Sequence, residues 1–156
     1  MSKNYEVVNI FDACSILLKM KGNRYEFNKE IAKIKRTVES NYNELIEELE
    51  LIRKEANELT LEYCKKDQNG KPVIEEVKDD TGKVIAKKYD GLMFGENPEY
   101  DERMKELNDK KRDFLKEESN IDLEAISITI KKNDLPLKSE DFDGELQAQI
   151  QQYIED

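Results

Sequence analysis

The chain has no histidine and no tryptophan among its 156 residues, and it has only three prolines and two cysteines. Histidine is the commonest general base and metal ligand in proteins, so its absence removes the simplest catalytic and metal sites. The chain also has no Cys-x-x-Cys pair, no Walker-type phosphate loop and no dinucleotide-binding glycine motif. We therefore expect a protein that is not an enzyme and that binds no cofactor and no metal ion.

Long apolar runs are missing as well. No segment approaches the roughly 20 apolar residues that a membrane-spanning helix needs, and the first residues do not form a signal peptide. Cys14 and Cys64 each lie within or beside an apolar pattern, which favours buried, reduced thiols. We expect an intracellular chain with no membrane contact.

Charge, by contrast, is abundant: charged residues make up 40% of the chain and the net charge is −10. Residues 117–156 alone contain eleven acidic residues and three lysines. Binding to a nucleic-acid backbone needs a basic face, so we expect no direct nucleic-acid binding. The one basic cluster contains Lys29, Lys33 and Arg36; it is the candidate site for a phosphate ligand, although a solvated helix face explains the same residues.

Apolar residues recur at steps of three and four between Phe27 and Tyr63, which predicts one long helix with a single apolar stripe. At about 1.5 Å per residue this helix is roughly 55 Å long. From Tyr42 onward the spacing is heptad-like, which requires a partner helix. The stripe consists of Phe27, Ile31, Ile34, Val38, Tyr42, Leu45, Leu49, Ile52, Ala56, Leu59 and Tyr63.

A second apolar run, Tyr100–Phe114, supplies that partner, and Asn97 is the expected N-cap of its helix. This helix is about 30 Å long and covers only half of the first one. Antiparallel pairing places it on the Leu45–Tyr63 half. The Phe27–Val38 half is left for the two chain ends or for another subunit.

Segments 72–77 and 83–89 flank a turn at 79–82 and predict a β-hairpin between the two helices. The next loop, Gly91–Gly95, contains three adjacent apolar residues, which either plug the end of the helix pair or dock on a partner protein. The candidate partner-binding residues are Leu92, Met93, Phe94, Ile74, Ile85 and Tyr89.

The chain ends predict smaller elements. Tyr5–Val8 is a candidate strand, and a short helix is expected from Asn9 to Gly22. Alternating isoleucines at 126–130 predict a half-buried strand that pairs with Tyr5–Val8. Ser139 is the expected cap of a last helix, whose apolar residues are Phe142, Leu146, Ile150, Tyr153 and Ile154.

Together these segments predict a mainly α fold (α+β). It contains a long antiparallel helical hairpin, coiled-coil-like, with a β-hairpin between its helices and a small α/β cap formed by both chain ends. We expect a single elongated domain, 1–156, with the terminal cap at 1–26 and 119–156, the helical hairpin at 27–66 and 97–118, and the β-hairpin arm and loop at 67–96.

The layout resembles a group of small acidic phage and prophage proteins of unknown function from Gram-positive bacteria. The resemblance rests on Val7-Val8-Asn9-Ile10, on the turn at 63–73 after a long charged helix, and on Phe114-Leu115-Lys116-Glu117-Glu118. It implies a phage or prophage origin and a location in the cytoplasm of the bacterial host cell, and it implies no activity. The helix–β-hairpin–helix plan is also similar to that of prefoldin-type chaperone subunits, which transfers no function.

Three functions are compatible with this sequence. The first is a non-enzymatic phage protein that acts by protein–protein contact with a host-defence or phage-assembly protein, as a homo-oligomer. The second is an acidic inhibitor of a host defence nuclease, anti-CRISPR-like or a DNA mimic, because carboxylate rows imitate phosphates. The third is a binder that sequesters a small nucleotide signal through Lys29, Lys33 and Arg36.

Overall fold

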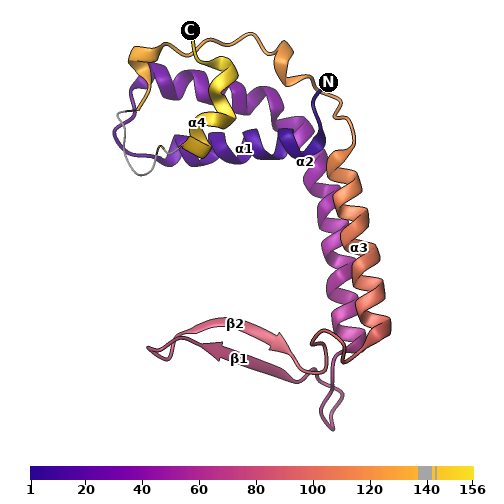
Figure 1. Ribbon diagram of the computed structural model, residues 1–156. Coiled ribbons are helices and arrows are strands. Elements are labelled where there is room, and N and C mark those ends of the chain that lie inside the picture. The colour runs from indigo at the N-terminus through magenta and orange to yellow at the C-terminus, as the bar shows by residue number, and fades with distance from the viewer. Residues whose placement is uncertain (137–141, 143) are drawn as a thin grey trace. The chain divides into compact units, whose positions relative to one another are not determined.

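The computed structural model describes residues 1–136, 142 and 144–156, and within them it is mainly helical with one small two-stranded antiparallel sheet (Figure 1). The elements are α1 (Asn4–Lys19), α2 (Tyr25–Tyr63), β1 (Ile74–Lys78), β2 (Val84–Tyr89), α3 (Pro98–Lys116) and α4 (Gly144–Ile150). Short 3-10 turns lie at Leu123–Ala125, Lys132–Asp134 and Gln151–Tyr153. The expected cap Ser139 lies outside the described residues.

Two compact units make up the chain. Unit 1 comprises Met1–Glu48 and Asp113–Asp156, and unit 2 comprises Leu49–Arg112. The long helix α2 begins two residues before the predicted start and ends at the predicted residue, Tyr63. It contributes its first part to unit 1 and its second part to unit 2.

The core of unit 1 lies between α1, the first part of α2 and α4. The four stripe residues of the Phe27–Val38 half of α2 are all fully buried there. Phe27 packs edge-on against Phe142, with 6.3 Å between the ring centroids. The two chain ends therefore cover this half of the stripe, and the stripe gives no reason for a second subunit at this place. The cluster is Val7, Ile10, Cys14, Leu17, Phe27, Ile31, Ile34, Val38, Leu123, Ile130, Phe142, Ile150, Tyr153 and Ile154.

The predicted strand Tyr5–Val8 is wrong, because these residues form the first turns of α1. Val7 lies three residues before Ile10, so the helical apolar period extends back past Asn9 and outweighs the strand preference of two adjacent valines. The Glu6 carboxylate accepts a hydrogen bond from the Lys3 backbone N–H at 2.7 Å, which satisfies one free donor at the helix start.

The predicted strand at 126–130 is also wrong. Its burial alternates as expected, but only Ile130 takes part in a bridge, a parallel one with Ile154. The partner at the N-terminus is a helix and cannot pair with a strand. Instead, Ser2 and Asn4 hold the chain that leaves α3: the Asn4 side chain donates to the Phe114 carbonyl at 2.8 Å, and the Ser2 Oγ accepts from the Leu123 N–H at 2.8 Å. The cap is therefore helical rather than α/β.

The helical core of unit 2 is much smaller. Ile52 and Leu59 of α2 form a cluster with Leu107 of α3. The polar tips of neighbouring side chains also meet: the Tyr63 hydroxyl donates to the Glu99 carboxylate at 2.7 Å. The N-cap prediction for α3 is confirmed, because the Asn97 side chain accepts a hydrogen bond from the Tyr100 N–H at 3.2 Å.

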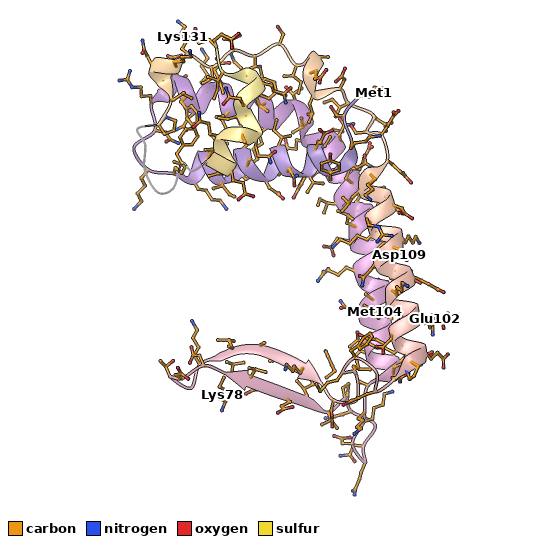
Figure 2. All side chains as sticks on the ribbon, in the orientation of Figure 1. Met1, Lys78, Glu102, Met104, Asp109 and Lys131 are labelled. Atoms are coloured by element: carbon orange, nitrogen blue, oxygen red, sulfur yellow. The ribbon has the colours of Figure 1, made fainter. Side chains whose placement is uncertain are left out.

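The predicted β-hairpin forms in unit 2, and in its register Glu75 lies opposite Lys88 and Glu76 opposite Lys87. Its turn is closed by Asp79, whose carboxylate accepts hydrogen bonds from the Thr81 hydroxyl and from two backbone N–H groups. The Thr81 hydroxyl is the main reason why the pKa of Asp79 lies below its usual value. In unit 2 the hairpin extends away from the ends of α2 and α3, and side chains stand on both of its faces (Figure 2).

Candidate protein-interaction surface

The root of the hairpin is fixed to the end of α2. The Lys65 N–H donates to the Asp90 carbonyl at 2.9 Å, and the Val73 N–H donates to the Lys65 carbonyl at 2.9 Å. The Asp90 N–H donates to the Val73 carbonyl at 3.0 Å and completes the ring of bonds. Gly91 follows with φ of +85°, and a Cβ there would lie 2.9 Å from Lys65 Cγ. Among the described residues, the backbone hydrogen bonds that join the hairpin to α2 lie at its base.

Beyond this root, the hairpin is open to solvent. Ile74 and Ile85, both predicted to bind a partner, are 46% and 61% exposed. Tyr89 is half-buried near the root. Each strand has a single neighbour in the sheet, so both outer edges carry backbone groups that no other strand pairs with. We call residues 73–94 the interaction segment; its exposed large apolar side chains are Val73, Ile74, Val84, Ile85, Met93 and Phe94.

The Leu92–Phe94 loop does not plug the end of the helices. Leu92 is half-buried, but Met93 is 68% exposed and Phe94 is 96% exposed. The Glu96 N–H donates to the Met93 carbonyl at 2.9 Å, and Gly95 has φ of +88°, as in a type II turn. Phe94 occupies the first central position of this turn, so its ring is presented at the apex.

Asp101 fixes this turn and was not singled out by the sequence. Its carboxylate accepts a hydrogen bond from the Gly95 N–H at 2.9 Å. The available signal was an acidic residue in the first turn of α3, which is usually explained by the helix dipole alone. The bond to Gly95 depends on the fold of the loop and is not visible in the local pattern.

The basic cluster lies on α2 in unit 1. Lys29 and Arg36 are exposed, and Lys33 forms an ion pair with Glu30 at 3.0 Å. Their neighbour Lys35 lies over the ring of Phe11, 5.1 Å from its centroid. Spacings of four and three residues place the three predicted phosphate ligands on one side of the helix. The two hollows described next are not lined by Lys29, Lys33 or Arg36.

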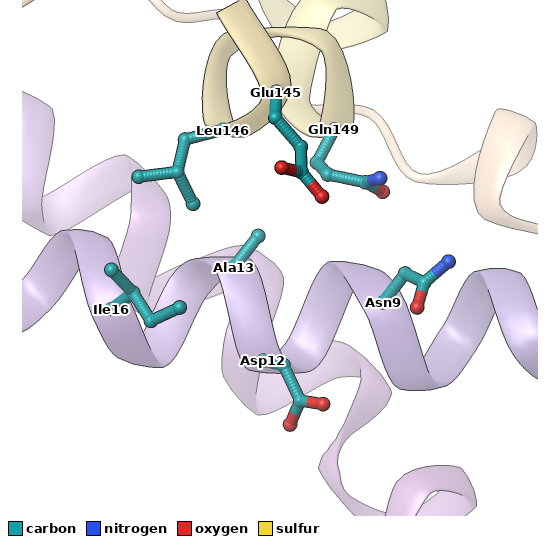
Figure 3. A pocket seen from close by; sticks show the side chains of 7 residues that line it. All are labelled: Asn9, Asp12, Ala13, Ile16, Glu145, Leu146 and Gln149. Atoms are coloured by element: carbon teal, nitrogen blue, oxygen red, sulfur yellow. The ribbon is translucent and has the colours of Figure 1, made fainter. Parts of the chain in front are cut away.

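A hollow of about 350 Å³ lies between α1 and α4 in unit 1 (Figure 3). Glu145 and Gln149 reach from α4 toward α1, whereas the Asp12 side chain points away from α4. Asp12 accepts a hydrogen bond from the Tyr42 hydroxyl at 3.2 Å, so it is engaged on α2. The two carboxylates of this hollow are therefore not arranged as a facing acid–base pair.

A second hollow of unit 1, of about 270 Å³, has an acidic lining that includes Glu44, Glu48, Glu117 and Glu118. All four carboxylates belong to exposed residues. Across residues 1–136, 142 and 144–156, no group of three or more His, Cys, Asp or Glu side chains is placed to hold a metal ion.

Two titratable groups, Cys14 and Tyr153, lie in the interior of the described part of unit 1. Burial raises the pKa of the Cys14 thiol to about 12 and that of the Tyr153 hydroxyl to about 12. The Tyr153 hydroxyl donates to the Leu123 carbonyl at 2.8 Å, which satisfies it in the protonated form. Cys64 is buried in unit 2 and, like Cys14, is a free thiol, as predicted.

The chain matches no protein-family profile, no curated protein and no solved structure. The resemblance to phage proteins and the origin that it implies therefore stay predictions. No helix in the described part of the chain is both long and apolar enough to cross a bilayer.

Proposed function

We propose that this chain is a non-enzymatic protein that acts by contact with another protein, and that the interaction segment makes the contact. The observation that supports this most is exposure: the described residues contain twelve exposed large apolar side chains, and six of them lie between residues 73 and 94. Surface apolar residues scattered singly are ordinary, but a concentration of them is typical of an interaction site.

The low stability expected of an isolated hairpin also supports this proposal. A two-stranded hairpin alone is marginally stable in water, because it has no third strand and no covered face. Covering apolar surface contributes roughly 25 cal/mol per Å². A partner that covers the interaction segment therefore gains binding energy and orders the hairpin at the same time.

We further propose that α2 and α3 pack as an antiparallel, coiled-coil-like hairpin that supports this segment. The Ile52, Leu59 and Leu107 cluster supports the proposal, as does the bond from Tyr63 near the end of α2 to Glu99 near the start of α3. In this arrangement the helices act as a stalk, and the contact surface lies at their linked ends.

Affinity capture from bacterial lysate, with and without phage infection, tests the proposal. We compare the tagged chain with Phe94→Ser and with a variant in which residues 71–90 are replaced by a short linker. Leu51→Ser is the matched control, because Leu51 is 62% exposed on α2. Capture of a host-defence or phage-assembly protein that survives Leu51→Ser and is lost in the other two variants supports the proposal. Equal capture by all variants contradicts it. Sedimentation of the purified chain checks the predicted homo-oligomer.

The acidic inhibitor is a second candidate, and the charge of unit 1 favours it. Unit 1 has twenty acidic and twelve basic residues, a net charge of −8. A DNA mimic that occupies a basic channel loses affinity steeply as salt rises, since screening weakens exposed charge pairs. Capture of a nuclease that is abolished by about 0.5 M salt and unaffected by Phe94→Ser selects this candidate.

A further inference from the structure

In the sequence, acidic residues flank the turn that presents Phe94 on both sides, while the basic side chain of Lys65 lies beside Gly91 and Arg103 follows the segment. Residues 90–102 contain five acidic residues and no lysine or arginine. Four of the five are exposed, and they lie on both sides of the apolar turn in the sequence. They are Asp90, Glu96, Glu99 and Glu102, with Asp101 half-buried beneath the turn.

Stabilisation of α3 explains only part of this pattern. Glu99 and Asp101 lie in the first turn of α3, where they complement the helix dipole. Asp90 and Glu96 precede the helix, and Asp90 belongs to the root of the hairpin through backbone bonds. Their carboxylates therefore add negative charge to the segment that contains Phe94, and stabilisation of the helix dipole does not explain them.

The apolar turn is also preorganised. Gly95 is held by the Asp101 carboxylate, and the Met93 carbonyl is held by the Glu96 N–H. A rigid aromatic side chain loses little conformational entropy on binding, which is why such residues act as anchors in interfaces. Phe94 is thus an exposed anchor that exposed acidic residues flank in the sequence.

The same charges limit what can cover it. Two copies of this turn that face each other across a two-fold axis bring acidic residues together, which costs energy. A partner with an apolar surface and a basic rim gains both from burial of Phe94 and from charge complementarity.

We infer that the Met93–Phe94 turn docks on a partner protein through an apolar surface bordered by lysine and arginine. This inference rests on the proposed function and adds the chemistry of the partner. The ring of Phe94 supplies the contact, and the carboxylates of Asp90, Glu96 and Glu102 supply specificity and faster association.

Two defined probes test the inference. Both are fluorescent amphipathic helical peptides with the same leucine stripe; the polar face is lysine in one and glutamate in the other. Binding to the full chain is measured by fluorescence anisotropy at about 50 mM and about 300 mM NaCl. We expect the lysine peptide to bind at least about tenfold more tightly than the glutamate peptide at low salt.

Variants locate the binding. Phe94→Ser is expected to weaken binding of the lysine peptide by about tenfold or more. The triple variant Asp90→Asn, Glu96→Gln, Glu102→Gln is expected to weaken it by about threefold to tenfold at low salt, with a smaller difference at high salt. The matched controls are Leu51→Ser and the triple variant Glu117→Gln, Glu118→Gln, Glu124→Gln, which removes the same charge from unit 1. Both controls are expected to stay within about twofold of the parent chain.

The outcomes separate this inference from the proposed function. If Phe94→Ser weakens both peptides equally and the triple variant of the turn has no effect, contact through the turn stands and the basic partner is overturned. If the unit 1 triple variant weakens binding as much as the turn variant does, general charge attraction explains the result and the inference fails. If the lysine peptide does not bind, the inference is overturned. If it binds and Phe94→Ser changes nothing, the contact through Phe94 fails as well.

Discussion

Unit 1 and unit 2 differ in how many of their apolar side chains are buried in a cluster and how many are exposed. Among the described residues, unit 1 gathers fourteen buried residues from both chain ends and α2 into one cluster, whereas the cluster of unit 2 has three. Of the twelve exposed large apolar side chains in the described residues, eight belong to unit 2. Cohesion is thus concentrated in unit 1, and apolar surface that remains available for contact is concentrated in unit 2.

Net charge, unlike exposed apolar surface, is concentrated in unit 1. Unit 2 has sixteen acidic and fourteen basic residues, so its net charge is −2, against −8 for unit 1. A nearly balanced surface does not repel an approaching protein of either sign at long range. We therefore propose that the acidic residues beside the Phe94 turn decide which partner surface fits. The net charge of unit 1 instead affects how the whole chain attracts or repels other molecules at long range.

The largest effect is expected in the core of unit 1. Phe27→Ala removes a fully buried ring that packs against Phe142, and we expect the free energy of unfolding to fall by about 3 to 5 kcal/mol. Urea titration followed by circular dichroism measures it. Tyr25→Ala, at a 74% exposed position on the same helix, is the control and is expected to change stability by less than about 0.5 kcal/mol. Equal losses in both variants would contradict the assigned core.

Alkaline pH should destabilise unit 1 through Cys14. Burial raises the pKa of this thiol from the ordinary 9.0 to about 12 in the folded chain. Between these values the unfolded chain loses a proton that the folded chain keeps, so the free energy of unfolding falls as pH rises, by up to about 4 kcal/mol. Stability below pH 9 is unaffected by this group. Denaturant titrations at several pH values check it; Cys14→Ala should reduce the slope and leave the part due to the raised pKa of Tyr153, and an unchanged slope would count against the assignment.

A smaller effect is expected at the cap of α3 in unit 2. Asn97→Ala removes the side-chain acceptor of the Tyr100 N–H, at a cost of about 1 kcal/mol. Asn97→Ser keeps an acceptor and should cost only a few tenths of a kcal/mol. Thermal unfolding of both variants measures the difference. If the two variants are equally destabilised, the cap bond does not contribute.

The smallest effect on stability is expected at the residue with the largest proposed role in binding. Phe94 is 96% exposed, so Phe94→Ser should change the free energy of unfolding by less than about 0.5 kcal/mol. Urea titration checks this beside the Phe27→Ala measurement. A loss above about 2 kcal/mol would mean that the ring is buried in the folded chain.

Much of unit 2 was predictable because its signals are local. The 3-and-4 spacing of α2, the Asn97 cap and the turn at Asp79–Gly82 each lie within a few neighbouring residues, and the register of the hairpin follows from its turn. Asp101 was missed because its bond to Gly95 needs the folded loop.

Unit 1 was predicted less well because long-range contacts hold its ends. Ser2 and Asn4 bond to residues more than one hundred positions away, which no local period reveals. Ile130 pairs with Ile154 alone, so alternation of burial at 126–130 occurs without a strand. The strand predicted from the Val7-Val8 pair is wrong because the helical apolar stripe that continues from Ile10 outweighs the local strand preference.

Residue-resolved hydrogen–deuterium exchange of the free chain tests the contrast between the two units most directly. The amides of α1 and of Phe27–Val38 should exchange only on global unfolding, because the apolar side chains of both segments belong to the buried cluster of unit 1. The amides of β1 and β2 should exchange orders of magnitude faster, because the hairpin is anchored at its base and both of its edges are free. Hairpin amides protected as strongly as the core of unit 1 would show that the interaction segment is already covered, and would contradict its assignment as the contact surface.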